Sequence, residues 1–192
     1  MCIRDRGVSL YLGRSLGVEG LGVITLANRI IGLLLVLALF GLPQVVLKHV
    51  AIGFERKDWK QVGDSIFTAS IISGLLAFII STTGYFFAPY LSVNIFNEPL
   101  LEIPLKISFI VLLPQCFSRI FGAGLNGFRK IWQSNLVNET LSMWIIAVLL
   151  IIIHLVKIDI NVVNVAIIYA ISRILVIILS LIHISEPTRR RG

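Results

Sequence analysis

Three arginines and one glutamate lie inside stretches of the chain that are otherwise apolar. Arg29, Arg119 and Arg173 each interrupt a run of aliphatic residues, and Glu139 lies near the start of another run. A charged side chain at the centre of a membrane helix costs at least about 2.5 to 3.5 kcal/mol on insertion scales, so it normally faces a water-filled cavity or pairs with an opposite charge. Because cations outnumber anions here, the pattern favours a cationic cavity.

Polar residues recur at helical spacing beside these charges. Gln115, Arg119 and Asn126 have the i, i+4 and i+11 spacing that places residues on one side of a helix. Thr25 lies four residues before Arg29 in the same way. We therefore expect five residues to line this cavity and to be the candidates for ligand binding: Arg29, Arg119, Arg173, Gln115 and Asn126.

A structural role for the same charges is the alternative. Arg119 could pair with Glu139 across the loop at 129–130, and Arg173 could extend toward the lipid headgroups. Glu139 is accordingly a candidate for an ion pair or for a coupling residue.

The composition indicates an integral membrane protein. Of the 192 residues, 57% are hydrophobic and only 14% are charged, and the mean hydropathy is +0.94, whereas roughly a quarter of residues are charged in soluble domains. Several apolar runs approach or exceed the roughly 20 residues that span a bilayer as a helix. We expect an all-α, polytopic transmembrane helix bundle with an N-terminal stub and about five spans, at 7–16, 23–46, 65–91, 103–125, 136–156 and from 162 onward.

The distribution of basic residues predicts the orientation of these spans. The two predicted loops on one side, at 48–64 and 126–135, carry six of them, and the loops on the other side carry three. Since Lys and Arg accumulate in cytoplasmic loops, the side with six is expected to be cytoplasmic. These six are Lys48, Arg56, Lys57, Lys60, Arg129 and Lys130, opposite Arg14, Lys106 and Lys157.

Motifs of soluble enzymes are absent from the sequence. It has no phosphate-binding glycine loop with a lysine and no paired cysteines or clustered histidines. We therefore expect no enzyme activity, no cofactor and no metal site.

The two ends of the chain have a different explanation. "MCIRDR" (1–6) and "LSLIHI" (179–184) can be encoded by opposite strands of one short DNA element, which resembles the transposase end used to prepare sequencing libraries. "SEPTR" resembles the adapter that follows it. We expect 1–6 and 179–192 to be adapter-derived and 7–178 to be the natural transmembrane fragment. A basic juxtamembrane tail at Arg189, Arg190 and Arg191 is the alternative.

Excluding both ends changes the reading of the net charge. Residues 7–178 keep 12 basic and 8 acidic residues, a balance of +4 instead of the +7 of the whole chain. The basic character is thus partly due to the ends, and we expect no nucleic-acid partner.

The segment "LGRSLGVEGLGVITLANRIIGLLLVLALFGLPQVVLKHVA" (12–51) resembles the N-terminal region of polysaccharide biosynthesis proteins, the lipid-linked oligosaccharide flippases of the multidrug/oligosaccharidyl-lipid/polysaccharide exporter superfamily. The resemblance lies in Arg-x-Leu-Gly at 14–17, in Gly20 and Gly22, and in Gly-Leu-Pro at 41–43. "GAGLNGFRK" (122–130) resembles the fourth helix of that family and the loop after it.

This resemblance implies a multi-pass transporter of two pseudo-symmetric halves in a bacterial or archaeal cytoplasmic (inner) membrane. It would flip an undecaprenyl-pyrophosphate-linked oligosaccharide, with cavity arginines holding the anionic head. The chain would be a partial N-terminal half, with the lipid-linked glycan, membrane lipid and the missing second half of its own chain as partners.

Two other functions stay open. A drug/cation antiporter of the same superfamily would use acidic cavity residues, for which only Glu139 is a candidate. A membrane-embedded glycan polymerase or acyltransferase would need large polar loops, and the loops here are short.

The origin of the two ends is directly testable. Amplification of this locus from unligated source DNA should give different codons on both sides of 7–178. Recovery of the codons for "MCIRDR" and "HISEPTR" from that DNA would show that both ends are native.

Overall fold

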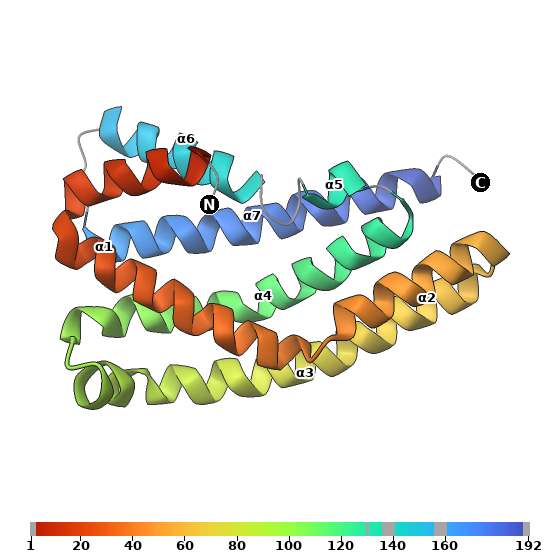
Figure 1. Cartoon of the computed structure of the whole chain (residues 1–192), viewed down its shortest axis with the longest axis horizontal. Helices are drawn as coiled ribbons and strands as arrows, with labels where there is room; N and C mark the ends of the chain where they lie inside the picture. The colour runs from red at the N-terminus through yellow and green to blue at the C-terminus, as the bar shows by residue number, and fades with distance from the viewer. Residues whose placement is uncertain (1–2, 130, 136–140, 156–160, 190–192) are drawn as a thin grey trace.

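The computed structural model describes the backbone of residues 3–129, 131–135, 141–155 and 161–189. Within these residues the elements are helices, and no strand occurs (Figure 1). Leu10–Leu39, Trp59–Ile95 and Pro99–Gly127 are long and apolar enough to cross a membrane, and Leu141–Ile153 and Val162–Ile178 are shorter apolar helices. The predicted all-α membrane helix bundle is confirmed.

Helix α1 (Ile3–Leu39) joins the predicted stub to the predicted first span. Gly17 interrupts it with φ 74° and ψ 178°, values outside the helical region. The chain reverses direction at this point (Figure 1). Glycine suits this position because it lacks the Cβ that makes positive φ costly in other residues.

Helix α2 (Leu42–Arg56) corrects two predicted boundaries. The expected span at 23–46 is broken after Leu39, where Phe40 and Gly41 have φ of 43° and 77° and Pro43 lies in the first turn of α2. The expected charged loop at 48–64 is also wrong, because α2 continues through most of it. The average hydropathy of this segment did not indicate a helix, because exposed basic residues on α2 offset the apolar residues on its other side. Val46 and Val50 on that side are buried.

Helix α3 (Trp59–Tyr90) begins six residues before the predicted span at 65–91. Asp58 caps it, since its carboxylate accepts the Gln61 backbone N–H at 3.1 Å. A π-helical turn (Leu91–Ile95) and a 3₁₀ turn (Pro99–Leu101) lead to α4 (Glu102–Gly127). The remaining helices are α5 (Ile131–Asn135), α6 (Leu141–Leu155) and α7 (Val162–Arg189).

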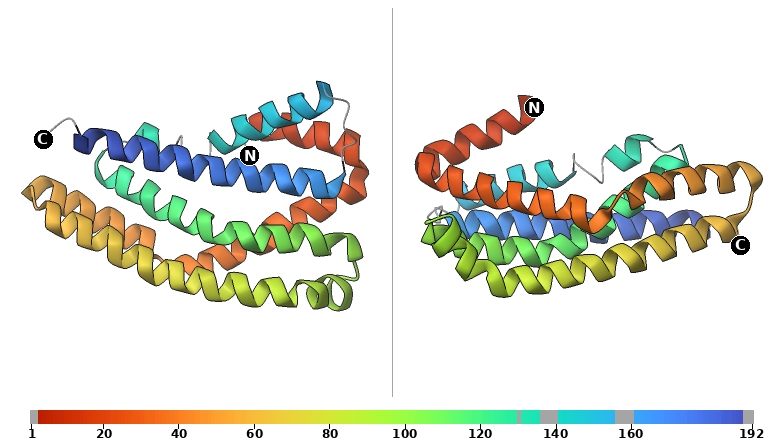
Figure 2. Two further views of the ribbon diagram at one scale, coloured as in Figure 1. Left: turned by 180° about the vertical axis from the view of Figure 1, so that it is seen from behind. Right: turned by 60° about the horizontal axis from the view of Figure 1, so that its bottom comes forward.

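Helix α4 lies at the centre of the bundle and contacts α1, α2, α3, α5 and α7. Seen from behind, it runs between α3 and α7 (Figure 2). Small residues on α3 allow close packing against it: a Cβ on Gly84 would come within 2.0 Å of the Phe109 ring, and the Ser81 hydroxyl donates to the Phe109 carbonyl at 2.6 Å. The position and orientation of α4 are therefore set by its contacts on several sides.

The break between α1 and α2 gives a testable stability difference between two glycines. Gly41 and Gly63 both have open space where a Cβ would lie, but only Gly41 has positive φ. Gly41→Ala should therefore lower the free energy of unfolding by about 1 to 2 kcal/mol. Gly63→Ala, in the interior of α3, should raise it by about 0.5 to 1 kcal/mol. Denaturation of the purified chain in detergent micelles measures both changes, and equal effects at the two sites would contradict the left-handed turn at Gly41.

Candidate functional site

The polar stripe predicted on α4 lies beside the helix face that packs on α3. The packed face carries Phe109, Leu112 and Cys116, all fully buried. Gln115, Arg119 and Asn126 lie on an adjoining side and are half-buried. Ser108 occupies the same side, because it lies 7, 11 and 18 residues before these three, which is about two, three and five helical turns.

Helix α7 meets this side of α4. A small cavity of about 10 Å³ is lined by Ser108 of α4, Tyr169 of α7 and Asn28 of α1, together with Ile24, Ala27, Pro104 and Ala166. Arg173 lies four residues after Tyr169 and is half-buried, so it continues the same side of α7. Arg119 therefore lies on the side of α4 that meets α7, and Arg173 lies on the side of α7 that meets α4. We call this contact between the two helices the α4–α7 seam.

The two arginines lie at different depths along the seam. Helices α4 and α7 run in the same direction (Figure 1), and Ser108 and Tyr169 mark a common level because both line the small cavity. At the helical rise per residue, Arg173 lies about 6 Å beyond that level and Arg119 about 16 Å beyond it. The guanidinium groups are therefore arranged in sequence along the bundle axis, with Arg119 nearer the end that carries the basic loops.

Arg119 and Arg173 differ in their interactions. Within the described residues, Arg119 forms neither a hydrogen bond nor an ion pair, whereas Arg173 already takes part in an interaction. The side-chain oxygen of Asn126 is buried and has no hydrogen-bond partner. An unpaired buried carbonyl costs about 1 to 3 kcal/mol, so the part of the seam toward the basic loops contains polar groups available to a ligand or to water.

Arg29 lies elsewhere on the bundle. The packed side of α1 is marked by buried Ala27, Ile31 and Leu35, while Arg29 and Thr25 are exposed. This places Arg29 on the opposite side of α1 from the contacts with α4 and α7. Glu139, the predicted partner of Arg119, lies outside the described residues, so its ion pair remains a prediction, as do the ligand roles of the five site residues.

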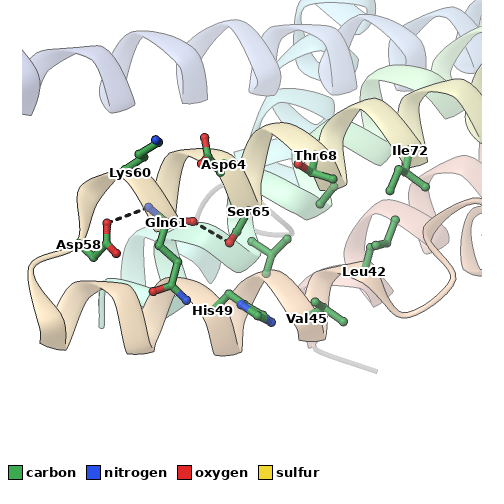
Figure 3. Close-up of a pocket in the computed structure, with 12 residues that line it drawn as sticks. Leu42, Val45, His49, Asp58, Lys60, Gln61, Asp64, Ser65, Thr68 and Ile72 are labelled. Carbon is green, nitrogen blue, oxygen red and sulfur yellow. Dashed lines mark hydrogen bonds between the residues drawn. The ribbon is translucent and has the colours of Figure 1, made fainter.

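A second hollow was missed by the sequence analysis. A groove of about 510 Å³ lies between α2 and α3, with His49, Lys60 and Asp64 on its walls (Figure 3). The spacing of 60, 64 and 68 on one side of a helix could have revealed it, but these residues were assigned to a loop or to the start of a span. In the described part of the chain, no group of three or more His, Cys, Asp or Glu side chains could hold a metal ion.

Comparison with known proteins identifies the family. The family described as "Polysaccharide biosynthesis protein" matches residues 7–189. No curated protein and no solved structure gave a match. The matched region runs from within α1 to the end of α7 and contains the predicted arginines and the motifs at 14–17 and 41–43. The chain belongs to the polysaccharide biosynthesis protein family.

Proposed function

We propose that the chain is part of a transporter that flips a lipid-linked oligosaccharide of the undecaprenyl-pyrophosphate type across the cytoplasmic membrane. Membership of the polysaccharide biosynthesis family supports this function, as do the apolar helices. The observation that carries the proposal is Arg119, a half-buried cation in an apolar helix with no hydrogen bond or ion pair among the described residues. Transport of a glycan carrier, rather than an enzymatic reaction, is the activity that we assign.

The chemistry of the seam suits an anionic head group. A guanidinium presents a planar fork of N–H donors that binds phosphate oxygens in pairs. Gln115 and Asn126 lie on the same side of α4 and add hydrogen-bonding groups, including the unpaired oxygen of Asn126. A pyrophosphate would therefore replace the water that solvates the Arg119 guanidinium inside the bundle.

The difference in depth between the two arginines suggests a direction of movement. Arg119 and Arg173 are separated by about 10 Å along the bundle axis, from their places on α4 and α7. A pyrophosphate first held by Arg119, nearer the end with the basic loops, would next meet Arg173. We propose that the head group passes from Arg119 to Arg173 as it leaves the cytoplasmic side.

The exposed position of Arg29 is consistent with a transporter that is larger than this chain. An exposed arginine within an apolar helix is costly when only acyl chains surround it. The exposed side of α1 is therefore where the proposed second half of the transporter, or a water-filled cavity between the two halves, would face.

Replacement of Arg119 tests the proposal. In a strain that depends on this gene for glycan export, Arg119→Ala should abolish export while the protein still inserts into the membrane, because the anionic head loses its main ligand. Arg119→Lys should restore export only in part, since an ammonium cannot form the paired contact. Export of the lipid-linked glycan is measured by its appearance on the outer leaflet, with membrane insertion checked by blotting.

Arg129→Ala is the matched control. Arg129 pairs with Glu55 at 2.8 Å, and these side chains are 76% and 65% exposed, so the ion pair contributes little to stability. Export should be unchanged in this variant. Normal export by Arg119→Ala would refute the ligand role, and loss of transport in Glu139→Gln alone would favour the cation antiporter.

A further inference from the structure

The groove between α2 and α3 changes from polar to apolar along its length. His49, Lys60 and Asp64 lie toward one end, and Leu42, Val45 and Ile72 lie toward the other (Figure 3). Helices α2 and α3 are antiparallel, so the polar C-terminal part of α2 lies beside the polar N-terminal part of α3. The apolar parts of the two helices lie together at the other end of the groove. A groove of this kind matches a molecule with a polar head and an apolar tail.

The charges at the polar end are of both signs. Lys60 supplies an ammonium, Asp64 supplies a carboxylate and His49 supplies an imidazole. Within the described residues, none of these three side chains forms a hydrogen bond or an ion pair. Asp58 and Ser65 differ, because Asp58 caps α3 and the Ser65 hydroxyl donates to the Gln61 carbonyl at 2.7 Å. The groove thus has available cationic and anionic groups and fits a head group that also carries both charges.

The length of α3 places the polar end at the membrane surface. Its 32 residues extend about 48 Å, well beyond the roughly 30 Å of the hydrocarbon core. Trp59, which is 55% exposed at the start of α3, belongs to the type of residue that favours the interface. Ile72 lies eight residues, about 12 Å, farther along α3 than Asp64. The groove therefore extends from the headgroup layer into the acyl-chain layer.

We propose that this groove binds a membrane phospholipid of the phosphatidylethanolamine type. The lipid phosphate would contact Lys60 and His49, the primary ammonium would donate hydrogen bonds to Asp64, and one acyl chain would lie along Leu42, Val45 and Ile72. A choline head lacks N–H donors, and a glycerol head lacks the cation. Asp64 is thus the residue that selects the ethanolamine head, and this lipid site is separate from the α4–α7 seam.

Lipid titration of the full chain in detergent, followed by native mass spectrometry, tests the site. The probes are phosphatidylethanolamine, phosphatidylcholine and phosphatidylglycerol with identical acyl chains. We expect the ethanolamine lipid to bind about tenfold more tightly than the other two, the size of effect that one charge-assisted hydrogen-bonded contact gives. Asp64→Asn should remove the difference between ethanolamine and choline lipids.

Glu55→Gln is the matched control, because Glu55 is an exposed carboxylate at the same end of the bundle that does not line the groove. It should retain the ethanolamine preference. Equal binding of the three lipids by the unmodified chain would overturn the proposal without relying on any variant. A preference for the ethanolamine lipid that persists in Asp64→Asn would also overturn it. So would tighter binding of the anionic glycerol lipid than of the other two, or the formation of dimers that exclude lipid from the groove.

Discussion

A guanidinium inside an apolar helix is the constraint on which the arrangement of this protein depends. The cost of placing such a charge in hydrocarbon is several kcal/mol, so the helices that carry Arg119 and Arg173 must supply a polar path or a counter-charge. Both residues are half-buried on helices that contact each other. Where α4 and α7 pack together, these two charges therefore need a polar group or water beside them.

Helix α4 meets two requirements on different sides. On one side, fully buried Phe109 and Cys116 pack against α3, where Gly84 permits the close approach of Phe109 and the Ser73 carbonyl lies 3.7 Å from the Cys116 sulfur. On the adjoining side, Arg119 and Asn126 keep polar groups without partners among the described residues. Tight packing on the first side fixes the positions of the residues on the second, which would keep the proposed ligand site preorganised.

The sequence predicts the helical class well and the boundaries and faces less well. The apolar span at 103–125 lies within α4, at 102–127, because Gly127 and the turn after it end the helix where the apolar pattern also ends. The loop predicted at 48–64 is instead helical, because a window average cannot distinguish an amphipathic helix with buried Val46 and Val50 from a polar loop. Helical spacing also grouped Arg29 with Arg119, but a pattern within each helix does not determine how neighbouring helices are rotated. Tertiary packing places Arg29 on the far side of α1.

The proposed ligand role of Arg119 requires that the α4–α7 seam admits water and attracts anions. It is tested most directly by the rate at which a cysteine at position 115 reacts with thiol reagents of opposite charge, in the full chain with Cys2 and Cys116 replaced by alanine. With Arg119 and Arg173 retained, Gln115→Cys should react several-fold faster with an anionic sulfonate reagent than with a cationic trimethylammonium reagent, because the local potential is positive. Inorganic pyrophosphate should slow the reaction. A cysteine that neither reagent modifies, or that the cationic reagent modifies faster, would contradict the account.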